Sequence, residues 1–336
     1  MTFSALRFVV ETLLTRVARV VVRVLPMPIV RAGGRALGRI TYVLNGERRR
    51  VALENLAHAF PGRSLPERRA MARAVFAHFG SVLLELLKFS TWSPERMRAA
   101  VEVEGADRVA QAMQPGRGAF FFTGHFGYWE IHGIAHALCI EPFSVLARPL
   151  DNPHLDAMLE NIRTCTGNRV IPRRGAVRRI LRDLAAGRGV GILIDQHLHE
   201  ADAVYVGFFR RPAATTSALA ALALRTGAAV IPLFALPLPG GRYRLIYEHP
   251  VEPPLADTPD AIREFTQRCT DVLEMYVRRH PDLWMWMHRR WRDGAGTANQ
   301  EREREHEPRS ENSGRVNTGS PPVQFAVLDR LRARDE

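Results

Sequence analysis

Cysteine and lysine are both scarce in this sequence. Its 336 residues include three cysteines, Cys139, Cys165 and Cys269, with no paired spacing between them. This excludes a disulfide framework and the common zinc-binding spacings, and it suits a reducing compartment. Lys88 is the only lysine among 47 basic residues, so the net charge of +12 is almost entirely due to arginine. Arginine grips phosphate and carboxylate with a planar fork, which indicates an affinity for anionic partners.

Several functional motifs are also missing. The chain has no Gly-x-Ser-x-Gly elbow, and its cysteines lie in no recognisable nucleophile motif. It has no zinc-finger spacing, no aromatic strand of the RNP kind and no basic leucine zipper, which argues against nucleic-acid recognition. His132 and His136 have a metal-compatible spacing on a helix, but no third ligand follows at a recognisable spacing. We therefore expect no metal site.

Residues 1–26 are predicted to form an amphipathic helix. At 100° per residue the arginines fall within one half-turn and the aliphatic side chains fill the other half. Pro26 ends the helix, and charged residues interrupt every window that is long enough to span a membrane. We expect the helix to lie at the cytoplasmic leaflet with its arginines toward anionic headgroups. The alternative is that the apolar stripe packs on the protein's own core.

Short apolar runs alternate with helical stretches after the first helices. Ser64 and Glu67 resemble the start of a capped helix within a helical region from about 46 to 90. Expected strands cover 119–123, 143–147, 169–171, 190–195, 228–235 and 243–248, and expected helices cover 153–165, 175–186 and 215–226. This pattern predicts an α/β fold, a mixed sheet covered by helices, within residues 27–292. Residues 293–336 lack a hydrophobic period and are predicted to be a disordered tail.

His125 follows the expected strand 119–123, and Glu130 comes five residues later. On an unbroken helix the two side chains would lie roughly 140° apart, so a contact requires the bend that Gly124 and Gly127 permit. The carboxyl end of a strand is where open α/β sheets carry ligand sites. We expect Glu130 to hold one imidazole nitrogen and leave the other free to accept a proton from a hydroxyl. With no nucleophile in the protein itself, that hydroxyl belongs to a substrate, which predicts acyl transfer.

The segment Gly-His-Phe-Gly-Tyr-Trp-Glu at 124–130 resembles the signature of the late lipid A acyltransferases. This lauroyl/myristoyl transferase family also contains the mycobacterial phosphatidylinositol mannoside acyltransferases. Further blocks follow in the family's order at 148–153, 195–196, 208–209, 212–216 and 284–291, and upstream blocks lie at 48–56 and 59–62. The likeness covers roughly residues 5 to 292. One departure is that Arg210 and Arg211 stand where relatives commonly have glycine, which alters the local turn or the group bound beside it.

The resemblance implies a glycerolipid-acyltransferase-like fold and a membrane-bound enzyme. It would move a fatty acyl chain from an acyl carrier protein or coenzyme A thioester to a hydroxyl of a lipid or glycolipid, expected to be a lipid A precursor. No metal or redox cofactor is expected. His125 would be the base and Glu130 its orienting partner. The implied substrate-binding residues are Arg148, Asp195, Gln196, Glu200, Phe208, Phe209, Arg289 and Arg290.

Each binding residue also has a structural interpretation. Arg148 binds phosphate or stabilises an oxyanion, or it pairs with Asp151 or Glu141. Asp195 and Gln196 shape the acceptor side, or Asp195 is a helix cap or holds the loop together. Glu200 is a second acidic site residue or a solvated loop acid.

Two further groups have the same ambiguity. Thr215 and Thr216 cap a helix or hold a phosphate there. The aromatic and cationic residues near the carboxyl end suit a membrane boundary or a lipid phosphate, or they lock the terminus by cation-π stacking; they are Trp284, Trp286, Arg289, Arg290 and Trp291. Candidate walls for the acyl chain, equally plausible as core, are Phe120, Phe121, Phe122, Phe126, Phe208 and Phe209.

Two functions of other classes remain open. A thioesterase-type hydrolase would use water in place of the acceptor. A non-catalytic protein that binds anionic membranes would explain the first helix and the arginines, but not the combination of His125 with the later blocks.

Overall fold

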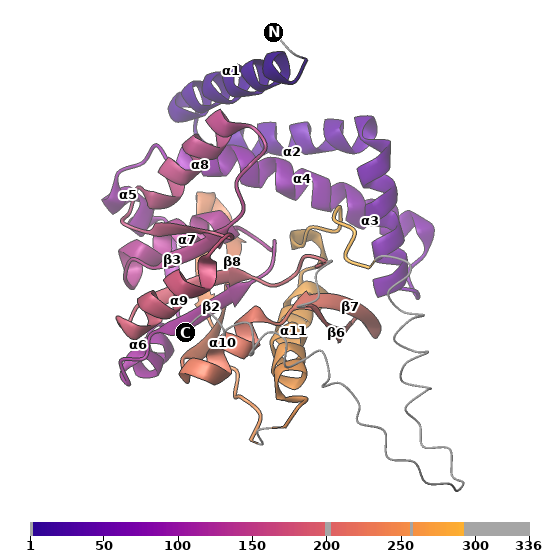
Figure 1. Ribbon diagram of the computed structural model, residues 1–336. Coiled ribbons are helices and arrows are strands. Elements are labelled where there is room, and N and C mark those ends of the chain that lie inside the picture. The colour runs from indigo at the N-terminus through magenta and orange to yellow at the C-terminus, as the bar shows by residue number, and fades with distance from the viewer. Residues whose placement is uncertain (1–2, 199–202, 256–257, 292–336) are drawn as a thin grey trace, which may run out of the picture.

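The computed structural model describes residues 3–198, 203–255 and 258–291 of the chain. Within them, seven strands form one sheet in the order β1-β9-β8-β2-β5-β3-β4, with helices on both faces (Figure 1). Strand β2 runs parallel to both of its neighbours, β5 and β8, whereas β8 and β9 pair antiparallel. The strands are β1 Val101–Glu104, β2 Ala119–Thr123, β3 Ser144–Ala147, β4 Arg169–Pro172, β5 Gly189–Leu193, β8 Ala229–Leu238 and β9 Arg242–Tyr247. The predicted mixed α/β sheet covered by helices is confirmed.

Helices make up most of the rest of the described chain. A two-stranded hairpin, β6 (Ala203–Phe208) and β7 (Arg211–Thr216), lies beside α11. The helices are α1 Phe3–Val24, α2 Met27–Leu44, α3 Gly46–Ala59, α4 Leu65–Phe89, α5 Pro94–Ala99, α6 Ala106–Met113, α7 Trp129–Cys139, α8 Pro153–Thr164, α9 Ala176–Ala185, α10 Ala218–Thr226 and α11 Ala261–Arg279. Short 3-10 turns at Pro239–Gly241 and Pro281–Leu283 complete the order.

The aromatic run of β2 joins the two halves of the core. Successive strand side chains point to opposite faces, so Phe120 and Phe122 pack with α9, α10 and α11, while Phe121 packs with α7 on the other face. All three are 0% exposed. A strand buried on both faces reads as a continuous apolar run, which is why the sequence identified β2 so clearly.

Helix α4 is the central helix of the amino-terminal half. Ser64 and Glu67 form a capping box at its start, as predicted. Its partner α2 approaches closely at Gly38, where an added Cβ would lie 2.0 Å from the carbonyl oxygen of Phe76. Among the described residues α4 alone is long and apolar enough to cross a membrane, but 56% of its apolar window is buried inside the protein. That burial is typical of a core helix.

The hairpin strands and β1 are the strands that the apolar pattern did not indicate, and α2, α5, α6 and α11 lie outside the expected helices. Strand β1 has the sequence Val-Glu-Val-Glu and therefore lacks an apolar run. The helix expected at 215–226 begins only at Ala218, because Thr215 and Thr216 end strand β7. The prediction that these threonines open a helix is therefore wrong. Residues 293–336 and Glu200 lie outside the described residues.

A tight turn at Phe209 and Arg210 connects β6 to β7. Their φ angles are +53° and +58°, so both residues are left-handed, as the two central residues of a type I′ hairpin turn must be. The left-handed region costs a residue with a Cβ about 1–2 kcal/mol. Arg210 therefore adopts the left-handed conformation at a cost in free energy, whereas glycine at this position would adopt it without strain.

Arg210→Gly should consequently stabilise the protein. Relief of the left-handed strain outweighs the extra chain entropy of glycine in the unfolded state, so we expect a gain of about 0.5–1 kcal/mol in the free energy of unfolding. Thermal and urea unfolding measure it. Arg210→Ala is the matched control, because it removes the same charge and keeps the Cβ. An equal gain in both variants would show that charge, not backbone strain, is responsible.

Candidate active site

His125 and Asp195 meet at the carboxyl edge of the sheet. His125 lies two residues after β2, and Asp195 lies two residues after β5. The two strands are adjacent, parallel and in register, with Thr123 opposite Leu193. The parallel pairing therefore brings both loops to the same point, as expected for a ligand site in a sheet of this kind.

The loop between His125 and α7 bends as its glycines predict. Gly127 has a φ of +56°, and an added Cβ there would lie 2.0 Å from the carbonyl oxygen of Ala235. The amides of Gly127 and Tyr128 donate to the carbonyls of Leu283 and Ala235. Helix α7 begins only afterwards, at Trp129, so Glu130 sits in its first turn while His125 precedes it.

Asp195 holds both the side chain and the backbone of His125. Its Oδ1 lies 2.8 Å from Nδ1 of the imidazole, and its Oδ2 accepts from the backbone N–H of His125 at 2.7 Å. The indole N–H of Trp284 donates to the same Oδ2 at 2.9 Å. Asp195 is 4% exposed and the His125 side chain 17%. The histidine is thus fixed on one side by a buried carboxylate and remains accessible at its edge.

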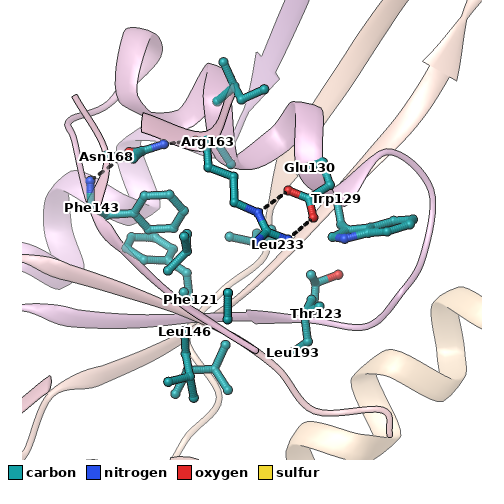
Figure 2. A pocket seen from close by; sticks show the side chains of 16 residues that line it. Phe121, Thr123, Trp129, Glu130, Phe143, Leu146, Arg163, Asn168, Leu193 and Leu233 are labelled. Atoms are coloured by element: carbon teal, nitrogen blue, oxygen red, sulfur yellow. Dashed lines mark hydrogen bonds and ion pairs between the residues drawn. The ribbon is translucent and has the colours of Figure 1, made fainter. Parts of the chain in front are cut away.

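The predicted contact between Glu130 and the imidazole is replaced by a different pair. Arg163, on α8, donates from Nε and Nη2 to the two carboxylate oxygens of Glu130 at 2.9 and 2.5 Å (Figure 2). Asp195 takes the orienting place that the sequence assigned to Glu130. The physical reason is that α7 carries Glu130 toward α8, whereas the register of β2 and β5 carries Asp195 to the histidine.

These contacts set the charge of the pair. Burial by itself lowers the pKa of His125, but the charge of Asp195 and its hydrogen bond outweigh burial, so the pKa is raised above its ordinary value. The charge of Glu130 raises it further. Burial favours neutral Asp195, yet the charge and hydrogen bonds of His125, with help from Trp284, lower the pKa of that carboxyl to about 2. Asp195 is therefore an anion at neutral pH and stabilises a protonated imidazole.

The second imidazole nitrogen faces Gln196. Nε2 of the Gln196 amide lies 3.3 Å from Nε2 of His125. An ionised Asp195 accepts from Nδ1–H, so the neutral imidazole carries its proton on Nδ1 and presents the lone pair of Nε2 toward Gln196. Nε2 is the basic atom of the site, and Gln196 is exposed. Asp195 and Gln196, both predicted site residues, thus meet His125 on its two sides.

A mainly apolar cavity lies between the sheet, α7 and α8 (Figure 2). Glu130, Arg163 and Trp129 line it, and Thr123 does so from the end of β2. The hydroxyl of Thr123 is buried and has no hydrogen-bond partner among the described residues. The Trp129 ring lies 5.4 Å from the His125 ring, so the cavity begins beside the histidine. Its other lining residues include Phe121, Gly133, Phe143, Val145 and Asn168.

Phe121 alone among the six candidate phenylalanines lines this cavity. Phe120, Phe122, Phe126 and Phe208 are 0% exposed and belong to the core cluster on the other side of the sheet. Phe209 packs with Phe208 and Trp286 in that same cluster. Their assignment as walls of an acyl slot or as substrate-binding residues is thus replaced by a core role.

The carboxyl-terminal aromatic and cationic residues also lie inside the protein. Trp284 and Trp286 are 1% and 0% exposed, and Arg290 is 1% exposed. The Arg290 guanidinium donates to the Ala214 carbonyl and the Thr215 hydroxyl, and it lies over the Phe208 ring. Burial lowers the pKa of Arg290 to about 10, although the charge of Asp195 opposes this. These contacts correspond to a locked terminus and not to a lipid-phosphate site.

Arg148 and Arg289 lie on the surface. The Arg148 guanidinium is 3.9 Å from the Asp151 carboxylate, and both side chains are about four-fifths exposed, at 79% and 81%. This contact is the pairing with Asp151 that was the structural alternative for Arg148. The Arg289 guanidinium lies 3.5 Å from the Glu47 carboxylate.

Sequence reasoning missed Arg163 and the role of Trp284 as an Asp195 donor. Arg163 stands on an expected helix among many arginines, and no spacing relates it to Glu130. His132 and His136 are both 0% exposed on α7, and His136 bonds to the Tyr247 hydroxyl. Among the described residues, no group of three potential metal ligands is present.

Known proteins resemble this chain across nearly the whole described region. The model of the bacterial lipid A biosynthesis acyltransferase family matches residues 2–293. The lipid A biosynthesis lauroyltransferase of Escherichia coli (strain K12) is 28% identical over 271 residues, which cover 80% of this chain and 87% of that protein. The lipid A biosynthesis myristoyltransferase of the same organism is 25% identical over 252 residues, covering 75% and 77%. The phosphatidylinositol mannoside acyltransferase of Mycolicibacterium smegmatis is 24% identical over 225 residues, covering 66% and 72%.

The match to the family model spans His125, Asp195, Glu130 and Arg163 together with the cavity beside them. The resemblance in the sequence motifs and the match of the family model over residues 2–293 agree. The chain belongs to the bacterial lipid A biosynthesis acyltransferase family, and it is an acyltransferase.

Proposed function

We propose that the protein moves a fatty acyl chain from a thioester to a hydroxyl of a glycolipid, with a lipid A precursor as acceptor. The observation that carries this proposal is the His125–Asp195 pair beside an apolar cavity at the sheet edge. A polarised base next to an apolar slot is what transfer of a fatty chain to an alcohol requires. The names of the lipid A relatives support the acceptor class.

The reaction is one displacement at the thioester carbonyl. Nε2 of His125 takes the proton of the acceptor hydroxyl while its oxygen forms a bond to the carbonyl carbon. The tetrahedral intermediate then expels the thiolate, which takes the proton back from the imidazolium. Ester, thiol and neutral histidine result, so atoms and charge balance without a metal or redox cofactor. Asp195 stabilises the imidazolium through its charge and its hydrogen bond to Nδ1.

Gln196 occupies the acceptor side of the histidine. Its amide lies where an acceptor hydroxyl would approach Nε2, so binding of the acceptor requires this exposed side chain to turn away. Glu130 acts through Arg163 and through its charge on the histidine. We assign it a positioning role: it holds the guanidinium at the wall of the acyl cavity, close to the reacting carbonyl.

The acyl chain enters the cavity between α7, α8 and the sheet, which has a volume of about 70 Å³ without a ligand and must widen to hold the whole chain. Its walls are Phe121, Phe143, Val145 and Ile134, and the Glu130–Arg163 pair stands at its polar side. Gly133 lines the same cavity, and an added Cβ there would meet no atom within 4 Å. A Cβ at 133 therefore meets open space, and we expect a larger side chain there to reduce the space of the cavity.

Gly133→Leu should shift the preference toward shorter acyl donors. Each methylene that loses its burial costs about 0.8 kcal/mol, so excluding two or three of them lowers kcat/KM for the longest accepted donor about 15- to 60-fold. Donors shorter by that length should keep their rates. A series of acyl thioesters measures the effect. Gly62→Leu is the matched control, since an added Cβ there also meets no atom within 4 Å. An equal loss for every donor length would contradict the assigned slot.

The first two helices provide the surface for the membrane. Aliphatic side chains of α1 face outward, with Leu14 64% and Val24 80% exposed, and Val43 and Leu44 on α2 are 67% and 78% exposed. We assign α1 as an amphipathic helix that lies on the cytoplasmic face of the inner membrane, and the fold as glycerolipid-acyltransferase-like. The acceptor would enter from that surface, and acyl carrier protein would deliver the donor from the aqueous side.

One assay tests the reaction and its alternatives. Purified protein is incubated with labelled acyl thioester, with and without a lipid A precursor in detergent. We expect label in the lipid only when acceptor is present. Free fatty acid as the sole product would support a hydrolase. Transfer to phosphatidylinositol mannoside from coenzyme A, but not to the lipid A precursor, would favour the second candidate, which the mycobacterial relative supports.

A further inference from the structure

A second cleft lies between α1 and α8, on the other side of α8 from the acyl cavity. It has a volume of about 720 Å³. Helix α1 contributes Arg16, Arg19 and Arg23, helix α8 contributes His154 and Asn161, and Thr91 follows α4. Asn161 and Arg163 are two residues apart on α8 and therefore point to different sides of the helix. The cleft is thus separate from the Glu130–Arg163 pair.

The three arginines form one face of α1 without a neutralising partner. Their spacing of three and then four residues places them above one another along the helix. No carboxylate pairs with any of them among the residues that the structure describes, and no acidic side chain of that region lines the cleft. Glu11, one turn before Arg16, is occupied by Arg7 and by the Asn152 amide. The cleft is therefore strongly cationic.

Polar contacts near both ends of α1 fix it to the protein and make the cleft a built feature. At the amino-terminal half, the Asn152 amide donates to the Phe8 carbonyl and to the Glu11 carboxylate. At the carboxyl end, the ammonium group of Lys88 donates to the Val22 carbonyl at 2.9 Å. Lys88 is 3% exposed, so the lone lysine of the chain serves as an internal clamp on the end of α1.

The walls of the cleft are apolar as well as cationic. Val20, Ala157 and Met158 line it together with the arginines. The aliphatic side chains on the outer side of α1, such as Leu13 and Val17, are more than half exposed at 59% and 52%. A ligand in the cleft thus meets guanidinium groups on one side and an uncovered apolar helix face next to them. That combination matches a phosphate joined to acyl chains better than a free inorganic ion.

We infer that this cleft binds the phosphate headgroup of a membrane lipid. The three guanidinium groups hold the phosphate oxygens, and the acyl chains of the lipid run along the exposed aliphatic face of α1. The site goes beyond the proposed acyl transfer, because binding here needs neither His125 nor the acyl cavity. It also differs from general attraction to an anionic surface, since one lipid molecule would occupy one cleft and bind saturably.

Calorimetry with a soluble short-chain lipid tests the site. Full-length protein is titrated with dihexanoyl phosphatidylglycerol below its micelle concentration, and in parallel with inorganic phosphate. We expect one saturable site for the lipid and at least tenfold weaker binding of phosphate. The variant Arg16→Gln/Arg19→Gln/Arg23→Gln should weaken lipid binding at least tenfold. Arg19→Gln alone, which disturbs α1 least, should weaken it several-fold.

A second triple variant controls for net charge. Arg178, Arg179 and Arg182 are exposed on α9 and have no ion-pair partner among the described residues, so their replacement by glutamine removes the same charge elsewhere. We expect this variant, and His125→Gln, to bind the lipid within twofold of the wild-type protein. Equal weakening in both triple variants would show diffuse attraction and overturn the cleft site. Phosphate binding as tightly as the lipid would overturn the lipid assignment. The assay contains no thioester, so a failure of acyl transfer would leave its result unchanged.

Discussion

Replacing His125 by glutamine should lower kcat for acyl transfer by about 10²- to 10⁴-fold, the contribution of a positioned general base. Glutamine retains a polar side chain near Asp195 but has no group that accepts a proton from an alcohol at neutral pH. The fold should persist, because the backbone N–H at position 125 still donates to Asp195. Single-turnover rates with labelled thioester measure the loss.

His249→Gln is the matched control for this substitution. His249 is exposed after β9, so the same chemical change is made far from the reaction. Its rate should equal that of the wild-type protein. Transfer by His125→Gln within tenfold of the wild-type rate would remove the histidine from the mechanism.

Asp195→Asn should lower kcat for acyl transfer about as much as His125→Gln does, because it changes the tautomer of the imidazole. Oδ2 of Asp195 accepts from two donors, the His125 backbone N–H and the Trp284 indole. An amide must therefore keep its oxygen at that position and turn its NH2 group toward Nδ1 of His125. The NH2 group donates to Nδ1, so the neutral imidazole carries its proton on Nε2 and cannot act as the base. The equivalent change of tautomer costs about 10⁴-fold in the serine protease triad.

A second substitution distinguishes two possible causes of low activity in Asp195→Asn, which are the wrong imidazole tautomer and a disturbed fold. Trp284→Phe removes one of the two donors, so the amide of an Asp195→Asn/Trp284→Phe protein is less constrained and part of its population can accept from Nδ1–H. We expect this double variant to be more active than Asp195→Asn alone. An equally active or less active double variant would show that the indole does not set the orientation of the amide. Circular dichroism and thermal unfolding check that both proteins are folded.

Local pattern was enough to predict most of the sheet and the position of His125. Strand β2 is buried on both faces and β5 is a continuous apolar run, so each was visible without knowledge of its neighbours. The bend at Gly127 followed from the geometry of a five-residue step. The hairpin β6–β7 was missed, because its turn uses Phe209 and Arg210 in place of the glycine or asparagine that marks such a turn.

The partner of His125 depended on information that a local pattern does not contain. Glu130 is five residues away and Asp195 seventy, yet the parallel register of β2 and β5 brings the distant residue into contact. The same limit applies to Arg163 and Glu130, which meet through the packing of α7 and α8. The carboxyl-terminal tryptophans illustrate a different limit, since aromatic and cationic composition is the same for a membrane boundary and for a buried terminus.

The most direct test of the central claim is to compare the pH dependence of kcat/KM with the titration of His125. If neutral His125 is the base, kcat/KM falls tenfold per pH unit below the pKa of the free enzyme's histidine. Asp195 raises that pKa, so both the kinetic limb and the imidazole NMR titration should lie above the ordinary histidine value. In Asp195→Asn the NMR titration should move to lower pH, because the carboxylate charge is gone and burial remains. The residual activity comes from the minor population whose imidazole keeps its lone pair on Nε2, so its kinetic limb should move with the titration. A kinetic limb that stays in place while the NMR titration of His125 moves would contradict the account.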